Sequence, residues 1–503
     1  MKKYIISVLA VPFLMLSSCE SDLTKINENP KDPANVDPSV LLTNVARQSF
    51  PVDNSANSAL RMLVNTGEEN DYQYLKWNNA SFDAYKNILL NDVKMMEEAA
   101  KSNNKNYQAI GKFFRALHFY NLSMRVGDIP YSEALRGETD NIRLPKYDKQ
   151  EDIFAGILNE LKEANTLINT NDKIGGDIVY NGNIERWKKL INSFRLKILI
   201  TLSKKTKVGN IDIKNEFASI VSTERLIESN NDNGQLTFFD LANSRYPTFN
   251  SSSYGSSLYM SDTFIQYFKD RKDPRIFTFA EQTTSAKEKN LALTDYNAYQ
   301  GGNPISPYSD NAKLIDQKII SKVKTRFYLD PVNEPSNILS YSELNFILAE
   351  AAVRGWINQG DAKRYYETAV KANFDFYKAN VKDSDKLFAG FDVNSYLNST
   401  LVAYNTTEST DKQLERILTQ KYMTMFHQSQ WTGYFDALRT GYPKLPIVSG
   451  GVFPKRFRYP QDEYNTNAQN LKAAISSQYG GKDDIFQMHG GYNKFFFIIT
   501  LYF

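Results

Sequence analysis

The sequence predicts a mostly α-helical body that carries two long irregular stretches. From Ser39 onward, apolar residues recur at three- and four-residue spacing, which is typical of amphipathic helices. Residues 230–261 and 283–335 lack this spacing and are rich in Asn, Ser, Gly and Tyr. The chain has 503 residues, enough to bury a substantial core. We therefore expect one helical body, residues 39–503, with loops at these two stretches.

The N-terminus has the order of a bacterial export signal. Lys2 and Lys3 precede an apolar run, and Leu16-Ser17-Ser18-Cys19 matches a lipobox. Cys19 is the only cysteine, so we expect residues 1–18 to be removed and Cys19 to carry acyl lipid such as palmitate. The alternative is an ordinary signal peptide followed by an unrelated cysteine. The apolar run is shorter than the roughly 20 residues that span a bilayer, so the lipid alone would hold the protein at the membrane.

Residues 19–38 form a predicted tether. Three proline pairs, Asn29-Pro30, Asp32-Pro33 and Asp37-Pro38, each disfavour helix in the residue before the proline. Glu20 and Asp22 follow the lipidation site and are either part of an export signal or simply solvated residues of the tether.

Five later segments have strong helical periodicity. Three of them cover residues 110–124, ending at Gly127, then 153–168 and 187–202. The clearest pair is residues 341–354 and 361–377, joined by a turn, with Asp361 as the expected N-cap. This pair resembles a tetratricopeptide-type hairpin. Because no fixed period is present, we expect scattered helical pairs and no regular solenoid.

The two irregular stretches are too long for simple connections, so they are either functional or disordered. Their aromatic content argues against disorder and predicts ordered surface loops. The apolar C-terminal tail, residues 495–503, is either a terminal β-strand or the product of a frameshift near His489.

Charge and motifs favour a binding protein. The net charge of +3 with no dense basic block argues against a nucleic-acid partner. None of the three histidines has a partner at metal-ligand spacing, and no HExxH, G-x-S-x-G or P-loop pattern occurs. The 57 acidic residues leave a glycosidase-type carboxylate pair open, but nothing marks one. We predict no catalytic residue, no metal and no cofactor.

Several phrases share the order found in one family. In chain order they are Gly127 to Leu135 (GDIPYSEAL), Trp187 with Asn192-Ser193 and Arg195-Leu196, Asp273-Pro274-Arg275, Ser342-Glu343 to Ala352, Gly360-Asp361-Ala362, Gln420-Lys421-Tyr422, Arg439 to Pro443, and Arg458-Tyr459-Pro460. Together they resemble the SusD/RagB-type outer-membrane nutrient-binding lipoproteins. Leu438 departs from the family, which usually has a second arginine there, and so do Thr432 and Tyr434, where Glu and Trp are common.

The resemblance implies a SusD-like fold, with tetratricopeptide-like helical pairs and a loop-rich ligand-binding face. It also implies a lipid-anchored protein at the cell surface of the outer membrane. Such proteins cap a SusC-like TonB-dependent transporter and deliver glycans to it, or peptides in some branches. The acidic Glu20 and Asp22 resemble the surface-export signal of Bacteroidetes-type lipoproteins.

Aromatic residues in polar phrases are the candidate ligand contacts, because flat rings suit the apolar faces of sugars. They are Trp77, Tyr74, Tyr254, Tyr296 and Tyr299. Trp77 is either a ligand platform or a packing residue at a helix entry. The leading function is glycan capture. The alternatives are oligopeptide capture, a lipid-anchored glycoside hydrolase, and an interaction scaffold without a small ligand.

Overall fold

The computed structural model describes residues 36–488, apart from 53 and 429. The predictions for Cys19, for most of the tether and for the tail from His489 lie outside the described residues.

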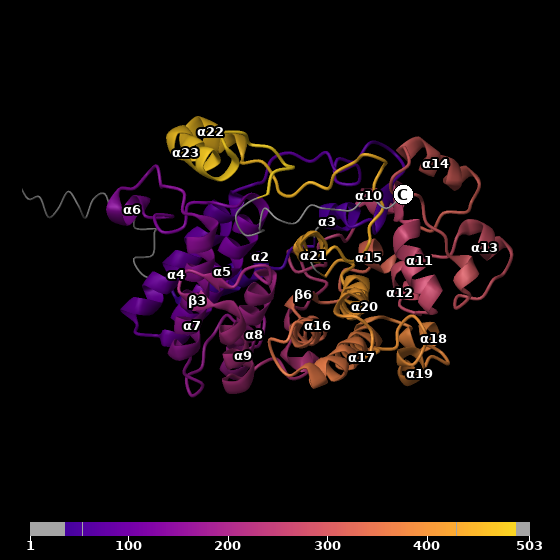
Figure 1. Cartoon of the computed structure of the whole chain (residues 1–503), viewed down its shortest axis with the longest axis horizontal. Coiled ribbons are helices and arrows are strands. Elements are labelled where there is room, and N and C mark those ends of the chain that lie inside the picture. Colours follow the sequence, from indigo (N-terminus) through magenta and orange to yellow (C-terminus); the bar gives the residue numbers. More distant parts are fainter. Residues whose placement is uncertain (1–35, 53, 429, 489–503) are drawn as a thin grey trace, which may run out of the picture.

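The N-terminal half is a row of packed helices, on the left in Figure 1. Each helix contacts the next in the order α2 (Pro38–Gln48), α4 (Leu90–Lys101), α5 (Lys105–Val126), α7 (Gln150–Leu167), α8 (Ile184–Thr201) and α9 (Ile213–Thr223). Asn104 and Asn183 accept hydrogen bonds from first-turn amides of α5 and α8 and so fix where these helices begin. Gly127 ends α5 with a φ of +93°, a conformation open to glycine. The three predicted helices are therefore confirmed.

The predicted hairpin is also confirmed. It consists of α16 (Tyr341–Val353) and α17 (Ala362–Asn380), which pack along each other, and α16 also contacts α8 and α20 (Thr410–Met423). Asp361 lies at the predicted N-cap position of α17, but its side chain caps no amide and contacts Arg364 instead. The chain enters α17 through the short turn η4 (Gln359–Asp361), which Asn358 caps.

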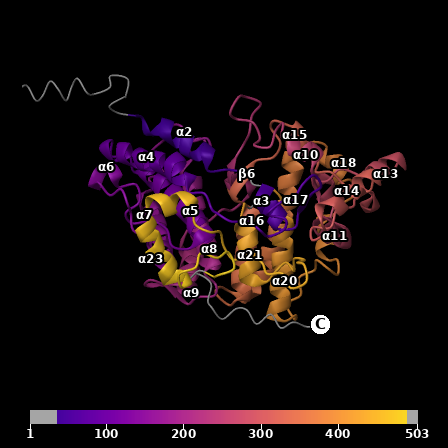
Figure 2. The same cartoon turned by 90° about the horizontal axis from the view of Figure 1, so that it is seen from above.

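The two irregular stretches contain short elements that the sequence analysis did not predict. The first holds η2 (Asn230–Asp232), β4 (Gly234–Leu236), α10 (Ser252–Ser256) and β5 (Leu258–Met260). The second holds α13 (Thr284–Glu288), η3 (Tyr296–Ala298), α14 (Tyr308–Asp316) and α15 (Arg326–Leu329). β5 pairs antiparallel with β1 (Leu63–Asn65), and β4 pairs with β6 (Ser336–Leu339). The helices α10, α13, α14 and α15 lie on the right in Figures 1 and 2.

The C-terminal part returns across the molecule. α21 (Thr432–Thr440) lies near the centre, and α22 (Gln461–Thr466) and α23 (Ala468–Tyr479) lie above α4 and α5 in Figure 1. Between them the Arg458 amide donates to the Asn78 carbonyl at 2.8 Å, and Asn79 and Arg458 form a parallel bridge. The other described elements are α3 (Asn54–Ala59), η1 (Tyr85–Leu89), α6 (Gly137–Asp140), β2 (Lys207–Val208), β3 (Ile211–Asp212), α11 (Asp262–Arg271), α12 (Ile276–Phe279), α18 (Ser384–Leu387) and α19 (Val393–Leu397).

Candidate ligand-binding face

Three segments from distant parts of the chain, which include α10 and the first residues of α14, meet at one surface. We call this surface the Tyr74 face and define it as residues 65–76, 252–257 and 303–310. The β1–β5 pair lies at its base and brings the first two segments together. The Thr66 amide then donates to the Ser257 carbonyl at 2.9 Å, and Gln73 Nε2 donates to the Pro304 carbonyl at 3.3 Å. The face is thus a defined structure, since hydrogen bonds hold each segment to another.

Tyr74 is the predicted contact residue that this face presents. Its ring is half-buried, and its hydroxyl donates to the Ser306 carbonyl at 3.0 Å. Lys76 Nζ lies 5.7 Å from the ring centroid. Burial, reinforced by the negative charge of Glu69, raises the pKa of the Tyr74 hydroxyl, so it stays a neutral donor and acceptor. A partly exposed ring with a fixed hydroxyl suits a ligand that is apolar on one side and polar at its edge.

The charge around Tyr74 is mostly negative. Glu68, Glu69, Asp71 and Asp310 are exposed on this face, and the cation within it is Lys76, whose Nζ lies 3.5 Å from Glu69. Such a surface favours uncharged ligands over anionic ones.

Trp77 lies in the core below this face, and the structure supports its packing alternative. The side chain is 2% exposed, with its ring 5.3 Å from Trp431, 5.2 Å from Tyr434 and 5.5 Å from Phe457 between centroids. Its Nε1 donates to the Arg456 carbonyl. The expected platform is not presented at the surface, because rings from residues 431–457 cover it. No local pattern around Trp77 indicates these distant partners.

Tyr254 and Tyr299 are also buried, at 0% exposure each, so neither ring is offered to a ligand. Tyr254 contacts His427 Nε2 at 3.1 Å through its hydroxyl and stacks on Tyr328. Tyr299 donates to the Leu293 carbonyl at 2.6 Å. These hydroxyls explain why tyrosine, and not phenylalanine, occupies polar phrases that fold into the core.

Tyr296 is half-buried. Tyr296 and Tyr299 both pack on Phe277, with centroid distances of 4.9 and 5.3 Å, and Lys272 Nζ lies over the Tyr296 ring. The structure brings these two predicted residues together at Phe277, while Tyr254 packs elsewhere, on Tyr328 and His427.

Tyr308 is a residue of the Tyr74 face that the sequence analysis did not single out. It is half-buried at the start of α14, directly after Pro307. The run of turn residues from Asn303 to Pro307 is the signal that, in hindsight, separates this part from the rest of its long stretch.

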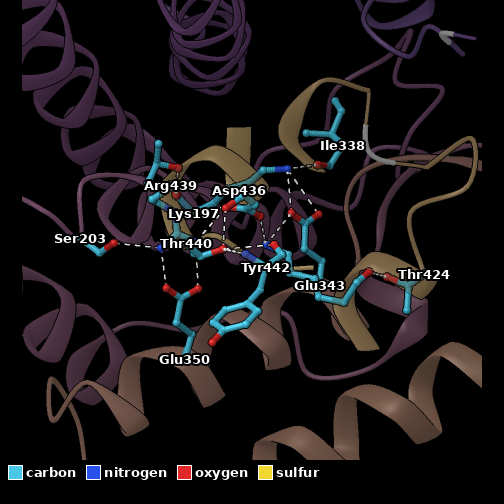
Figure 3. A network of polar contacts seen from close by, with 12 residues as sticks. Lys197, Ser203, Ile338, Glu343, Glu350, Thr424, Asp436, Arg439, Thr440 and Tyr442 are labelled. Atoms are coloured by element: carbon cyan, nitrogen blue, oxygen red, sulfur yellow. Dashed lines mark hydrogen bonds and ion pairs between the residues drawn. The ribbon is translucent and has the colours of Figure 1, made fainter. Parts of the chain in front are cut away.

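Several of the family-like phrases form buried charge clusters, and none of these clusters includes a residue of the Tyr74 face. Figure 3 shows Arg439 of α21 between Glu350 of α16 and Asp436, at 2.9 and 2.8 Å from Nη2. Lys421 Nζ of α20 lies 2.6 Å from Asp436. Burial acts to raise the pKa of Asp436, but Lys421 and Arg439 lower it well below its usual range. This carboxylate is therefore charged and paired with two cations, which suits a structural role in holding α20 and α21 together.

The Asp273-Pro274-Arg275 phrase forms a second buried cluster. Arg275 Nη2 lies 2.6 Å from Asp273 Oδ2, and both side chains are 0% exposed. Asn373 of α17 and Gln420 of α20 accept from the same guanidinium at 2.7 and 2.9 Å. This cluster joins α12 to α17 and α20.

Within residues 36–488, excluding 53 and 429, no group of three or more His, Cys, Asp or Glu side chains is arranged to hold a metal ion. In the same part of the chain, no helix has both the length and the apolar composition needed to cross a bilayer.

A helical frame that carries an ordered loop face suits a protein that binds its ligand at the surface. Comparison with known proteins identifies the family. Residues 30–460 match the family model described as SusD-like, "starch-binding associating with outer membrane". This chain belongs to the SusD-like family of outer-membrane nutrient-binding proteins.

Solved structures agree with this assignment. An outer-membrane protein of Bacteroides vulgatus with a suggested role in nutrient binding is 45% identical, with a TM-score of 0.88 over 91% of this chain and 100% of that one. A SusD homologue of Bacteroides fragilis is 44% identical, with a TM-score of 0.86 over 91% and 99%. A chitin-binding protein is 26% identical, with a TM-score of 0.71 over 90% and 99%. A comparison with curated protein sequences gave no match. The predicted family and the mostly α-helical, SusD-like fold are confirmed.

Proposed function

We propose that this protein is a lipid-anchored cell-surface receptor that captures a neutral glycan at the Tyr74 face and passes it to a SusC-like TonB-dependent transporter. The observation that carries the proposal is the half-buried Tyr74 ring, fixed through its hydroxyl to Ser306 on a face made of three interlocked loops. Family membership supports nutrient binding at the outer membrane.

The chemistry of the face supports a glycan as the nutrient. Tyr74 and Tyr308 supply ring surface for the C–H faces of sugars, and the surrounding Asn, Ser, Asp and Glu side chains suit sugar hydroxyls. The exposed carboxylates disfavour acidic polysaccharides. The chitin-binding relative makes chito-oligosaccharides a sensible probe beside starch fragments.

Binding with and without the Tyr74 ring tests the proposal. The soluble chain lacking its signal and Cys19 is titrated calorimetrically with maltohexaose, chitohexaose, xylohexaose and mannohexaose. Removing a binding hot spot typically costs about 2 kcal/mol, so Tyr74→Ala should weaken binding of the active probe by tens of fold. The matched control is Tyr365→Ala, which removes another half-buried tyrosine, on α17. Equal losses in both variants, or no loss at Tyr74, would contradict the assignment.

The same incubations test for hydrolysis. We propose that the protein does not cleave its ligand, because it belongs to a family of nutrient-binding proteins. The expected outcome is no new reducing ends after prolonged incubation. Steady release that one acidic substitution abolishes would favour the hydrolase alternative.

A further inference from the structure

A concave site separate from the Tyr74 face lies where the two irregular stretches meet the end of α17. It is a cavity of about 460 Å³, within the size range of small-ligand sites. We call it the inter-loop cavity. β4 and the residue after it supply Gln235 and Thr237, α15 and its flanks supply Arg326 and Asn333, and Asn380 is the last residue of α17. None of these residues belongs to the Tyr74 face.

The positive charges in the wall are neutralised by the protein itself. Lys324 Nζ lies 3.4 Å from Glu281, and Arg326 Nη1 lies 2.7 Å from Glu334. At the rim, Lys382 Nζ reaches Asp330 at 2.8 Å. An anionic ligand would have to compete with these carboxylates, so the wall is suited to an uncharged one.

Two donors in the wall have no hydrogen-bond partner among the described residues, namely Arg326 Nη2 and Asn333 Nδ2, and both are buried. Arg326 Nε donates to the Thr278 carbonyl at 2.8 Å, and Nη1 donates to Asn333 Oδ1 at 2.5 Å. The second contact fixes the Asn333 amide, because its oxygen must accept from the guanidinium and its Nδ2 must be the unpaired donor. Both atoms belong to residues that line the cavity, and unpaired buried donors are costly, so a ligand whose acceptor oxygens reach these two atoms would be stabilised.

Hydroxyl and amide groups complete the wall. Thr237 and Thr325 are exposed at its surface, and Gln235 and Asn380 are half-buried. The wall therefore combines neutral donors and acceptors with aliphatic side chains such as Val332 and Leu387, which suits a sugar that has both hydroxyls and apolar C–H faces.

We propose that the inter-loop cavity is a second binding site for a neutral, hydroxyl-rich glycan. The inference rests on the proposed function, because it takes the captured nutrient to be a glycan, but it places the ligand at different residues.

One contact connects the two sites: Tyr254 of α10, at the Tyr74 face, stacks on Tyr328 of α15, which flanks the cavity, at 6.2 Å between centroids. A polymer that reaches both sites gains effective concentration at the second once it is held at the first.

The test fills the cavity without disturbing the fold. Thr237→Trp places a large side chain at an exposed position in the wall, and Thr223→Trp, at the exposed end of α9, is its matched control. Asn333→Asp is a second variant, since it keeps the oxygen that accepts from Arg326 and removes the unpaired donor. The soluble chain is titrated with the four hexasaccharides named above, and stoichiometry and affinity are measured together.

For the probe that binds, wild type and Thr223→Trp should bind two molecules per chain, and Thr237→Trp should bind one. Asn333→Asp should weaken the second site at least tenfold. If Thr237→Trp binds like wild type while Tyr74→Ala loses binding, the cavity inference is overturned and the proposed function stands. If Thr237→Trp loses binding while Tyr74→Ala does not, the cavity stands and the Tyr74 assignment fails. Binding of none of the four probes would overturn both, and selective binding of a polygalacturonate or a peptide in the cavity would overturn the inference.

Discussion

At the residue scale, burial separates the tyrosine and tryptophan residues that polar sequence context had grouped together. Tyr74 lies at a surface, whereas Trp77, three residues later, lies in the core. The sequence shows both in one polar phrase, and nothing in that phrase distinguishes them. The difference comes from partners such as Trp431 and Phe457, more than 350 residues away in the chain.

Trp77→Ala should destabilise the protein. Removing a buried aromatic side chain costs about 3–5 kcal/mol, so the urea midpoint and the Tm should both fall clearly. Tyr74→Ala is the companion variant, and its Tm should stay near that of wild type. A Trp77→Ala protein with unchanged Tm would restore the platform alternative.

Because two histidines are buried, we expect the free energy of unfolding to fall at acid pH. Burial lowers the pKa of His118 to about 4 and that of His427 to about 3, from 6.5. Above pH 6.5 each is neutral in both the folded and the unfolded chain. Below pH 6.5 the histidines of the unfolded chain bind protons, whereas those of the folded chain stay neutral until the pH approaches their lower pKa. For His118 alone, stability should therefore fall by roughly 3 kcal/mol between pH 6.5 and 4.

The hydrogen bonds of His118 indicate the variant to use. Ser49 Oγ donates to the Val45 carbonyl, so His118 Nε2 must donate to Ser49 Oγ at 2.8 Å. A glutamine amide supplies the same donor without titrating. His118→Gln should flatten the dependence of the urea midpoint on pH below 6.5, and an unchanged pH profile would show that His118 is not responsible.

At the scale of elements, the long helices were predictable and the short strands were not. α7 and α17 bury one face against neighbouring helices, so their sequences carry a 3.6-residue pattern. α5, α8 and α16 are buried on most sides, and their length and apolar content marked them as helices. β1 and β5 have three residues each and exist because Leu63 pairs with Met260. A pairing across that separation leaves no local signal, which is why residues 230–261 read only as loop. The Tyr74 face rests on this pairing. Its residue types could be predicted from the sequence, but which segments come together to form it could not.

The charge network between helices should be a major source of stability. Arg439→Ala leaves Glu350 and Asp436 buried with a positive partner removed, and breaking a buried pair in this way costs about 3–5 kcal/mol. Arg136→Ala breaks the exposed pair with Asp140 and should leave the unfolding midpoint nearly unchanged. Denaturant unfolding of the two variants measures the difference. Equal midpoints would mean that the network contributes little.

At the scale of the whole molecule, a helical frame supports binding loops, and we propose that lipid on Cys19 holds it at the membrane. Stable attachment needs more than one acyl chain, which a lipoprotein cysteine provides. Cys19→Ala should therefore move the protein from the outer-membrane fraction to the soluble fraction. The fractionation is done in cells without the transporter, so that docking does not retain the protein. A variant that still sediments with membranes would refute the anchor.

The bridge between Asn79 and Arg458 has a consequence for biogenesis. It fastens the Trp77 segment, directly before it, to a stretch of chain that is synthesised almost 380 residues later. Closing so long a loop is entropically expensive and comes late in folding. A chain interrupted before residue 458 lacks this bridge beside the Tyr74 face. Under the proposed function, such a truncated chain should therefore capture less ligand than the finished protein.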